Sequence, residues 1–221
     1  MKKKIYFIAE VGVNHEANFK LAKKIIYDAK QGGADAVKLQ SYKAEKIASR
    51  YAKAYWDKKE EKEDNQLTLY KRFDKFKNID YLKIINYCKK IKIDFIITPF
   101  DLETINFFKN KVKYFKISSS DITNFPLIEK IAKTKKPIIL STGASNKKEI
   151  TDAVKLIKKY NKKLTLLHCI LNYPTKRYDA NLGMIDDLKK SYALPVGLSD
   201  HTNPKDSHDI LLLAAMKNIS M

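Results

Sequence analysis

The stretch Gly33-Ala-Asp-Ala-Val-Lys-Leu-Gln40 joins a short apolar run to polar side chains at its end, and this combination recurs along the chain. Other short runs, rich in β-branched or aromatic residues, alternate with longer stretches whose apolar residues follow a helical spacing. Strand patterns that alternate with helix patterns are typical of βα units and a parallel sheet. We predict seven strands, at Ile5–Val11, Ala36–Gln40, Phe95–Thr98, Tyr114–Ser118, Pro137–Ser141, Leu164–Cys169 and Pro195–Ser199.

Two architectures share this rhythm, the open doubly wound sheet and the closed eight-stranded barrel. Neither of the glycine-rich phosphate motifs, GxGxxG and GxxxxGK(S/T), follows the first predicted strand, so the chain offers no support for a nucleotide site. Every predicted strand ends in polar or charged side chains, as the active sites of barrels require. We therefore predict an α/β fold of the TIM-type (β/α) barrel, with seven of its eight strands in one domain over residues 1–221.

The connections between the predicted strands differ in length. Most hold one amphipathic stretch with capping residues: Asp101 and Asn124 stand at N-cap positions, and Gly32-Gly33 stands where a helix should end. The longest connection covers about residues 42–79, and this length is typical of a functional lid or a mobile excursion. We predict such a lid or excursion there, and it contains Tyr51, Tyr55, Trp56 and the acidic run Glu60–Asp64.

The net charge of +19 raises the hypothesis of nucleic-acid binding, because basic side chains neutralise phosphates. Only three of the 44 basic residues are arginine, namely Arg50, Arg72 and Arg177, and the lysines are spread through every predicted helix. Base-reading sites and phosphate clamps favour arginine, because its planar fork binds in a bidentate manner. We therefore expect a solvated, lysine-rich surface and no nucleic-acid partner.

The chain shows no pattern of export, of membrane insertion or of a disulfide framework. No run approaches the roughly 18 apolar residues that span a bilayer, and the apolar stretch after Met1–Lys4 is too short for a signal peptide. Cys88 and Cys169 form neither a CxxC pair nor a metal-type cluster, which indicates buried, reduced thiols. We expect a cytoplasmic protein without a membrane partner.

Two lysines interrupt predicted strands that are otherwise apolar. Lys38 lies in Ala-Val-Lys-Leu-Gln, and Lys116 lies in Tyr-Phe-Lys-Ile-Ser. Alternate residues of a barrel strand point inward, and a lysine in a barrel mouth is costly to desolvate unless an anion compensates it. Hydroxyls of Thr98, Ser119 and Ser141 lie at neighbouring strand ends and would complete a cradle for a phosphate or a carboxylate. The strand ends therefore predict an anion-binding site.

One histidine stands where a metal ligand would belong. His201 lies beside Asp200 at the end of a predicted strand, whereas His208 opens the last predicted helix and is interpreted as structural. A divalent ion needs three or more ligands from protein or substrate, and Glu10, directly or through water, is the natural second contributor. We predict a metal contact at His201.

Seven motifs carry these residues, in order along nearly the whole chain: AEVGVNHE (9–16), GADAVKLQ (33–40), ITPFD (97–101), KISSSDITNFPLI (116–128), KPIILSTGAS (136–145), LLHC (166–169) with YPT (173–175), and GLSDHT (197–202). Together they resemble the family of sialic acid synthases, which make N-acetylneuraminate and related nonulosonates. The resemblance implies a barrel enzyme that condenses phosphoenolpyruvate with an N-acetylated hexose, such as N-acetylmannosamine or a bacterial relative. The products would be a nine-carbon 2-keto acid and phosphate.

The resemblance also implies roles for single residues. Gln40, Asp121 and Tyr173 would contact the sugar, His201 would bind a divalent metal such as Mn²⁺ or Mg²⁺, and Glu10 would hold the metal-bound water. The full-length protein would be a homodimer. Catalytic roles would fall to Glu10, Lys38, Lys116 and Asp121, and phosphoenolpyruvate would be bound by Lys38, Thr98, Lys116, Ser119, Ser141 and Ser199.

The implied roles give a mechanism. A metal held by His201 would act as a Lewis acid on the open-chain aldehyde of the sugar, which would raise the electrophilicity of that aldehyde toward C3 of phosphoenolpyruvate. Lys38 and Lys116 neutralise the phosphate and the carboxylate. Water then adds at C2 with Glu10 as the base, and phosphate leaves.

The chain departs from the pattern of the family in three respects. Leu171, beside Asn172, stands where members commonly have a polar residue. The Glu-Lys-His-Phe motif of the eighth strand, with the second metal-binding His, does not occur in the 221 residues, and neither does an antifreeze-like C-terminal domain. A seven-stranded sheet would leave its first and seventh strands as open edges. We expect a fragment that is poorly stable and inactive alone.

Two other functions stay open. The first is a non-catalytic protein of barrel origin whose basic surface binds polyanions. The second is an aldolase-type barrel in which Lys116 forms a Schiff base with a keto acid. Trapping with borohydride separates the second from the synthase, because the synthase route forms no imine.

Overall fold

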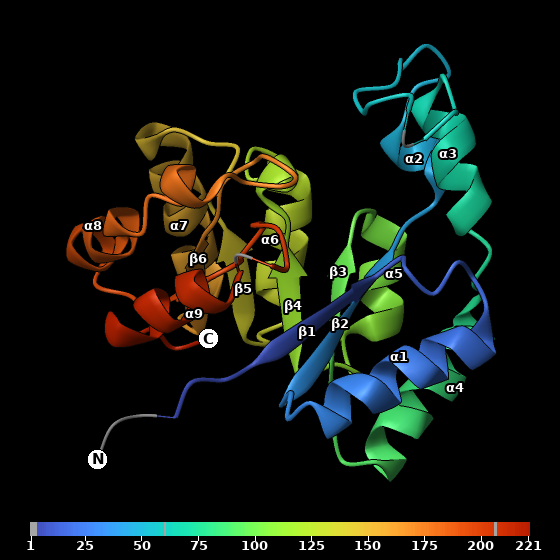
Figure 1. The fold of residues 1–221 in the computed structure, drawn as a ribbon, viewed down its shortest axis with the longest axis horizontal. Coiled ribbons are helices and arrows are strands. Elements are labelled where there is room, and N and C mark those ends of the chain that lie inside the picture. Colours follow the sequence, from blue (N-terminus) through green and yellow to red (C-terminus); the bar gives the residue numbers. More distant parts are fainter. Residues whose placement is uncertain (1–3, 60, 206) are drawn as a thin grey trace. The chain divides into compact units, whose positions relative to one another are not determined.

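The computed structural model describes residues 4–59, 61–205 and 207–221 (Figure 1). The chain divides into two compact units. The first, called the N-terminal unit below, is Ile8–Lys113. The second, called the C-terminal unit, is Tyr114–Met221 together with the described residues before Ile8.

The N-terminal unit contains three parallel strands in sequence order, with helices in the connections. Glu10 is in register with Lys38, and Gln40 is in register with Thr98. Helices α1 and α4 lie side by side (Figure 1), where the ammonium of Lys23 on α1 sits 4.8 Å from the ring centre of Tyr87 on α4. The elements are β1 (Ile8–Gly12), α1 (Phe19–Gln31), β2 (Ala36–Ser41), α2 (Ala44–Ile47), α3 (Gln66–Phe73), α4 (Asn78–Lys90), β3 (Asp94–Pro99) and α5 (Leu102–Phe108).

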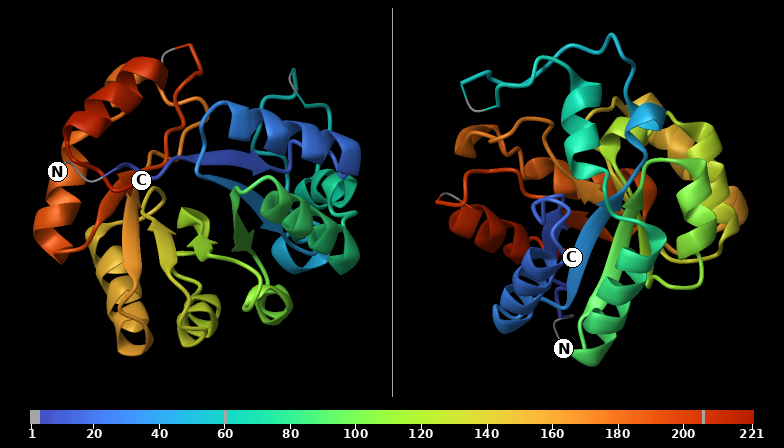
Figure 2. Two further views of the ribbon diagram at one scale, coloured as in Figure 1. Left: turned by 90° about the horizontal axis from the view of Figure 1, so that it is seen from below. Right: turned by 90° about the vertical axis from the view of Figure 1, so that its right-hand side faces the viewer.

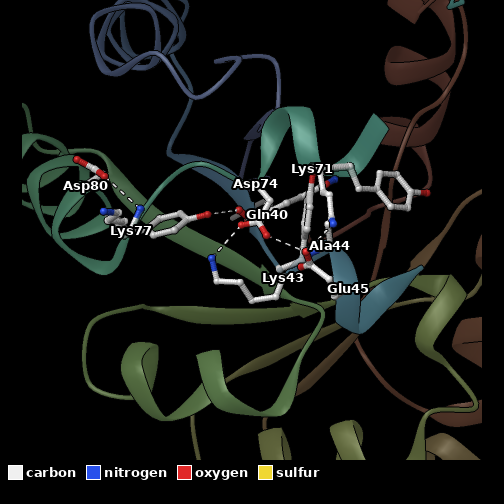
Figure 3. Close-up of polar contacts among 11 residues, drawn as sticks. Gln40, Lys43, Ala44, Glu45, Lys71, Asp74, Lys77 and Asp80 are labelled. Atoms are coloured by element: carbon white, nitrogen blue, oxygen red, sulfur yellow. Dashed lines mark hydrogen bonds and ion pairs between the residues drawn. The ribbon is translucent and has the colours of Figure 1, made fainter. Parts of the chain in front are cut away.

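The connection after β2 carries helical structure and is fastened to the chain that leaves that strand (Figure 3). The Asp74 carboxylate accepts hydrogen bonds from the Ala44 backbone N–H and from Lys43 Nζ, each at 3.0 Å. Lys71 Nζ lies 3.0 Å from Glu45 Oε1 in a second ion pair. The predicted excursion over residues 42–79 is thus built around α2 and α3 and held at its base by Asp74.

The C-terminal unit contains four parallel strands, again in sequence order. Helices α6 and α7 lie side by side on one face of these strands (Figures 1 and 2). The elements are β4 (Tyr114–Ile117), η1 (Ser119–Asp121), α6 (Phe125–Lys133), β5 (Ile138–Ser141), α7 (Lys147–Tyr160), β6 (Leu164–His168), η2 (Arg177–Asp179), α8 (Gly183–Tyr192), β7 (Val196–Leu198) and α9 (Ser207–Met216).

The expectation of an open edge at the seventh strand is wrong for part of its backbone. The Ser220 N–H donates to the Val196 carbonyl at 2.9 Å, and the Leu198 N–H donates to the Met221 carbonyl at 2.9 Å. The Ser220 carbonyl in turn accepts from the Tyr6 N–H at 3.1 Å. Residues 220–221 therefore satisfy backbone groups that the predicted edge would leave unpaired.

The described structure confirms the α/β class, the seven parallel strands and the capping residues. As predicted, Asp101 caps α5 and Asn124 caps α6 through side-chain oxygens, and Gly32 follows the end of α1. Asn18, which was not predicted, caps α1. Cys88 and Cys169 are buried free thiols, as predicted. Within the described residues, no helix has the length and apolar character needed to cross a membrane.

Candidate functional site

A buried lysine forms the centre of a polar cluster in the N-terminal unit. Lys38 Nζ lies 2.5 Å from Glu10 Oε2 and donates to Thr98 Oγ1 at 3.0 Å. Lys38 is 8% exposed, whereas the Glu10 side chain is half-exposed. Three neighbouring strands contribute these groups, because β1, β2 and β3 run in register. Lys38 and Thr98, two residues of the predicted anion site, are thus in contact, and Glu10 is the charge partner of Lys38.

Gln40 and Glu10 approach the same point of the backbone. Gly12 has φ +53°, and a Cβ there would lie 3.3 Å from Glu10 Oε1 and 3.8 Å from Gln40 Nε2. The backbone carbonyl of Gln40 accepts a hydrogen bond from the Tyr81 hydroxyl at 2.9 Å. Burial raises the pKa of Tyr81 to about 12, so this phenol stays a donor at neutral pH. Tyr81 holds the end of β2, and sequence reasoning missed this residue.

A second buried lysine lies in the C-terminal unit. Lys116 Nζ donates to Ser141 Oγ at 2.5 Å and to the Ile117 carbonyl at 3.2 Å, and Lys116 and Ser141 are both buried. Strands β4 and β5 are paired neighbours, which places the ammonium beside the hydroxyl. The Ser141 hydroxyl and the Ile117 carbonyl are thus two of the polar contacts of this buried ammonium, and an ammonium beside a hydroxyl can also bind an anion.

Ser119 lies close to Gly143 in the same unit. A Cβ at Gly143 would lie 3.3 Å from Ser119 Oγ and 2.6 Å from Cys169 Sγ, so the absence of a side chain lets these groups approach. Ser119 and Cys169 are both buried. The loop that follows β5 therefore lies against the Ser119 hydroxyl, which the sequence predicted as an anion contact.

Asp121 follows Ser119 in η1. Burial raises the pKa of its carboxyl group, and the hydrogen bond that Asn124 Nδ2 donates to Asp121 Oδ1 at 3.1 Å opposes this shift. The Asp121 carboxyl therefore takes up a proton at a higher pH than an exposed aspartate does. A carboxyl group in this state suits a hydrogen bond with a sugar hydroxyl or a proton transfer.

The side chains of Tyr173 and Ser199 lie against His201, which follows the end of β7. His201 Nδ1 donates to the Ile170 carbonyl at 2.7 Å, because a carbonyl oxygen only accepts. In the neutral imidazole Nε2 is then the acceptor, and it lies 3.1 Å from the Tyr173 hydroxyl and 3.4 Å from Ser199 Oγ. The two rings stack with centroids 4.1 Å apart. Ser199, His201 and Tyr173 are thus one cluster.

The orientation of His201 fits a metal ligand. Metal-binding histidines usually donate their other ring nitrogen to a carbonyl or a carboxylate, as His201 does to Ile170. Among the residues described, no three His, Cys, Asp or Glu side chains gather into a metal-binding group. His201 could therefore supply one ligand of the required tautomer, and substrate, water or other parts of the protein would have to supply the rest.

The remaining histidines have other surroundings. His168 Nε2 donates to the Ala180 carbonyl at 2.8 Å. Burial lowers the pKa of His168, and this hydrogen bond opposes the shift. His15 is buried and stacks on Phe76 at 4.4 Å between ring centroids, and burial lowers its pKa to about 4. His208 is exposed beside Asp209. The geometry of His168 and His15 is that of neutral, structural histidines.

Comparisons with known proteins place the chain in a family. The NeuB family model matches residues 25–216. An N,N'-diacetyllegionaminic acid synthase from Campylobacter jejuni is 42% identical over 209 residues, which cover 90% of this chain and 61% of that protein. Another from Legionella pneumophila is 38% identical, with 89% of this chain and 57% of that protein covered. This chain thus spans about three fifths of these curated relatives.

A solved relative has the same fold. The crystal structure of N-acetylneuraminic acid (sialic acid) synthetase from Leptospira borgpetersenii, in complex with citrate, superposes with a TM-score of 0.86. That protein is 34% identical, and the match covers 99% of this chain and 72% of that one. The resemblance to sialic acid synthases is confirmed. This chain belongs to the NeuB family, together with synthases named for sialic and legionaminic acids.

Proposed function

We propose that the whole protein condenses phosphoenolpyruvate with an N-acetylated hexose, such as N-acetylmannosamine or a bacterial relative, to a nine-carbon 2-keto acid and phosphate. The observation that carries the proposal is the buried Lys116 beside Ser141, found in a family whose relatives are named as sialic and legionaminic acid synthases. A buried ammonium next to a hydroxyl suits a substrate that carries both a phosphate and a carboxylate.

Two lysine clusters would bind the anionic groups of phosphoenolpyruvate. In the C-terminal unit, Lys116, Ser119 and Ser141 would hold one such group, and Ser199 would add a hydroxyl. In the N-terminal unit, Lys38 would do the same with Thr98, since Lys38 Nζ already lies at hydrogen-bond distance from that hydroxyl. The ammonium groups neutralise charge and so allow an anionic enol phosphate to react as a nucleophile.

The reaction proceeds in three steps. The π electrons of phosphoenolpyruvate form a bond from C3 to the aldehyde carbon of the open-chain sugar, whose oxygen gains a proton. Water adds at C2 and gives a proton to Glu10, the proposed base, whose charge partner Lys38 is 2.5 Å away. Phosphate then leaves C2 and the keto group forms. Gln40, Asp121 and Tyr173 would orient the sugar.

His201 would provide a ligand for a divalent ion such as Mn²⁺ or Mg²⁺. When bound, such an ion supplies Lewis-acid polarisation of the sugar aldehyde. The hydrogen bond from His201 Nδ1 to the Ile170 carbonyl supports this role, because it keeps Nε2 as the acceptor nitrogen.

For the fold, the proposal extends the seven parallel strands to a (β/α)₈ barrel. The pairing of Ser220 and Met221 with Val196 and Leu198 supports it, because these two residues lie where a strand after β7 would begin. The fold similarity to the Leptospira synthetase agrees with this extension.

The release of phosphate tests the proposed reaction. The full-length protein, given phosphoenolpyruvate and Mn²⁺, should release phosphate only when an N-acetylated hexose is added. Lys116→Met should abolish this release, and Lys159→Met, a substitution on the surface of α7, should leave it unchanged. Release without sugar would contradict the proposal. Retention of substrate on Lys116 after borohydride treatment would favour the alternative function, a Schiff-base aldolase. The burial of Lys116 is the observation that favours this alternative.

A further inference from the structure

The Tyr173 hydroxyl sits on the nitrogen of His201 that a metal would use. We propose that this hydroxyl is a displaceable cap on His201 Nε2, so that binding of a divalent ion at His201 and release of Tyr173 are one event. The inference rests on the proposed metal role of His201 and gives Tyr173 the part of a positioning residue.

The hydrogen bonds of His201 carry the first step. Nδ1 is committed to the Ile170 carbonyl at 2.7 Å, so Nε2 is the nitrogen with the lone pair in the neutral ring. The Tyr173 hydroxyl, 3.1 Å away, is then the donor and uses that lone pair. A metal ion at Nε2 needs the same lone pair, so the phenol proton and the ion compete for it.

The space around His201 Nε2 is also limited. Metal–nitrogen distances at imidazole are about 2 Å along the lone-pair direction. The phenol oxygen lies 3.1 Å from Nε2, within the space that such an ion and its remaining ligands would occupy. Binding of an ion at Nε2 therefore requires the phenol to give up its hydrogen bond to that nitrogen.

The Tyr173 side chain lies largely in solvent, which leaves space for this movement. Tyr173 is 69% exposed, and its ring lies on the His201 ring in a stack with 29° between the planes. An exposed phenol regains water at its hydroxyl when it leaves Nε2. Since Tyr173 is also proposed to contact the sugar, the hydroxyl released from His201 becomes available to that substrate.

Titration of the full-length protein with Mn²⁺ alone tests the cap, with free Mn²⁺ followed by electron paramagnetic resonance. Tyr173→Phe keeps the stacked ring and removes the competing hydroxyl. We expect the Kd for Mn²⁺ to fall about fivefold, the ratio that corresponds to one net hydrogen bond. Tyr178→Phe is the matched control, because Tyr178 is an exposed tyrosine of the same unit that contacts the Lys176 ammonium. The Kd of Tyr178→Phe for Mn²⁺ should equal that of the unsubstituted protein.

His201→Ala distinguishes the metal role of His201 from the capping role of Tyr173. Loss of the Mn²⁺ site in His201→Ala, together with tighter binding in Tyr173→Phe, is the expected result. If His201→Ala weakens binding but Tyr173→Phe leaves the Kd unchanged or raises it, the cap is overturned and the metal role stands. If His201→Ala leaves the Kd unchanged, the metal role and the cap both fail, while phosphate release with sugar still tests the condensation.

Discussion

Lys38 and Glu10 form an ion pair across the paired strands β1 and β2, with 2.5 Å between Nζ and Oε2. The lysine is buried and the carboxylate is half-exposed, so solvent reaches the pair from the side of Glu10. The carboxylate compensates the charge of the buried ammonium. The ion pair also brings the proposed base, Glu10, to one of the proposed phosphoenolpyruvate contacts.

Lys38→Met should therefore impair catalysis more than folding. We expect kcat/KM to fall by about a hundredfold or more, the size of loss that follows removal of one electrostatic donor at a reacting group. The free energy of unfolding should change by about 1 kcal/mol at most, because the remaining Glu10 is half-exposed to water. Lys24→Met, which removes an exposed pair with Asp28 on α1, is the control and should change neither quantity appreciably. Equal losses in both variants would refute a specific role for Lys38.

Asp121→Asn should separate stability from activity. Burial raises the pKa of Asp121 in the folded protein above its unfolded value, so the stability that this carboxyl contributes is lost as the pH rises through the folded pKa. The neutral amide of Asn does not ionise, so Asp121→Asn removes this loss of stability. The urea midpoint at pH 7 should therefore rise, while the midpoint at pH 3 should stay the same. Activity should fall about tenfold to a hundredfold, because a charged hydrogen bond to the sugar is lost. A lower midpoint at pH 7 would contradict this interpretation of the burial.

His15 makes the N-terminal unit sensitive to acid. Burial lowers its pKa from 6.5 to about 4, so the unfolded chain binds more protons between these values and stability falls as the pH drops through that window. The loss amounts to about 3 kcal/mol. His15→Phe keeps a ring to stack on Phe76 and should flatten the dependence of the urea midpoint on pH between 6.5 and 4. His208→Gln, at an exposed position, should leave the slope of the urea midpoint against pH unchanged. An unchanged slope in His15→Phe would count against His15 as the cause of the acid sensitivity.

Gly143→Ala tests how the loop after β5 places Ser119. The new methyl group would lie 2.6 Å from Cys169 Sγ and 3.1 Å from the Cys169 carbonyl oxygen, which should destabilise the protein by about 1–3 kcal/mol. The KM for phosphoenolpyruvate should also rise, because Ser119 Oγ lies 3.3 Å from the same point. Gly183→Ala is the matched control: its added Cβ meets no atom within 4 Å. A loss of stability in Gly183→Ala equal to that in Gly143→Ala would show that the contacts with Cys169 are not the cause.

Local patterns predicted the strands, the helix ends and the two buried lysines. Lys38 and Lys116 were predictable because each interrupts an apolar strand, and Asp101 because its side chain caps the helix that it precedes. The first strand begins at Ile8 and not at Ile5, since its register with Ala36 begins there and Tyr6 bonds instead to Ser220. Strand propensity alone does not determine that Tyr6 pairs with Ser220.

The contacts that orient the site residues could not be predicted from the sequence. The Tyr81 hydroxyl meets the Gln40 carbonyl across 41 positions, and the Ile170 carbonyl meets His201 across 31. Any residue type could supply the carbonyl of Ile170, so no sequence signal marks it. Such contacts depend on how the elements pack, which local patterns do not specify.

Isotope transfer tests the proposed condensation most directly. Phosphoenolpyruvate labelled with ¹⁸O at the bridging C2 oxygen is given to the full-length protein with Mn²⁺ and an N-acetylated hexose. Since water is proposed to add at C2 before phosphate leaves, the label should appear in phosphate, in an amount equal to the nine-carbon 2-keto acid formed. Label retained in the keto acid, or phosphate formed without that product, would contradict the account.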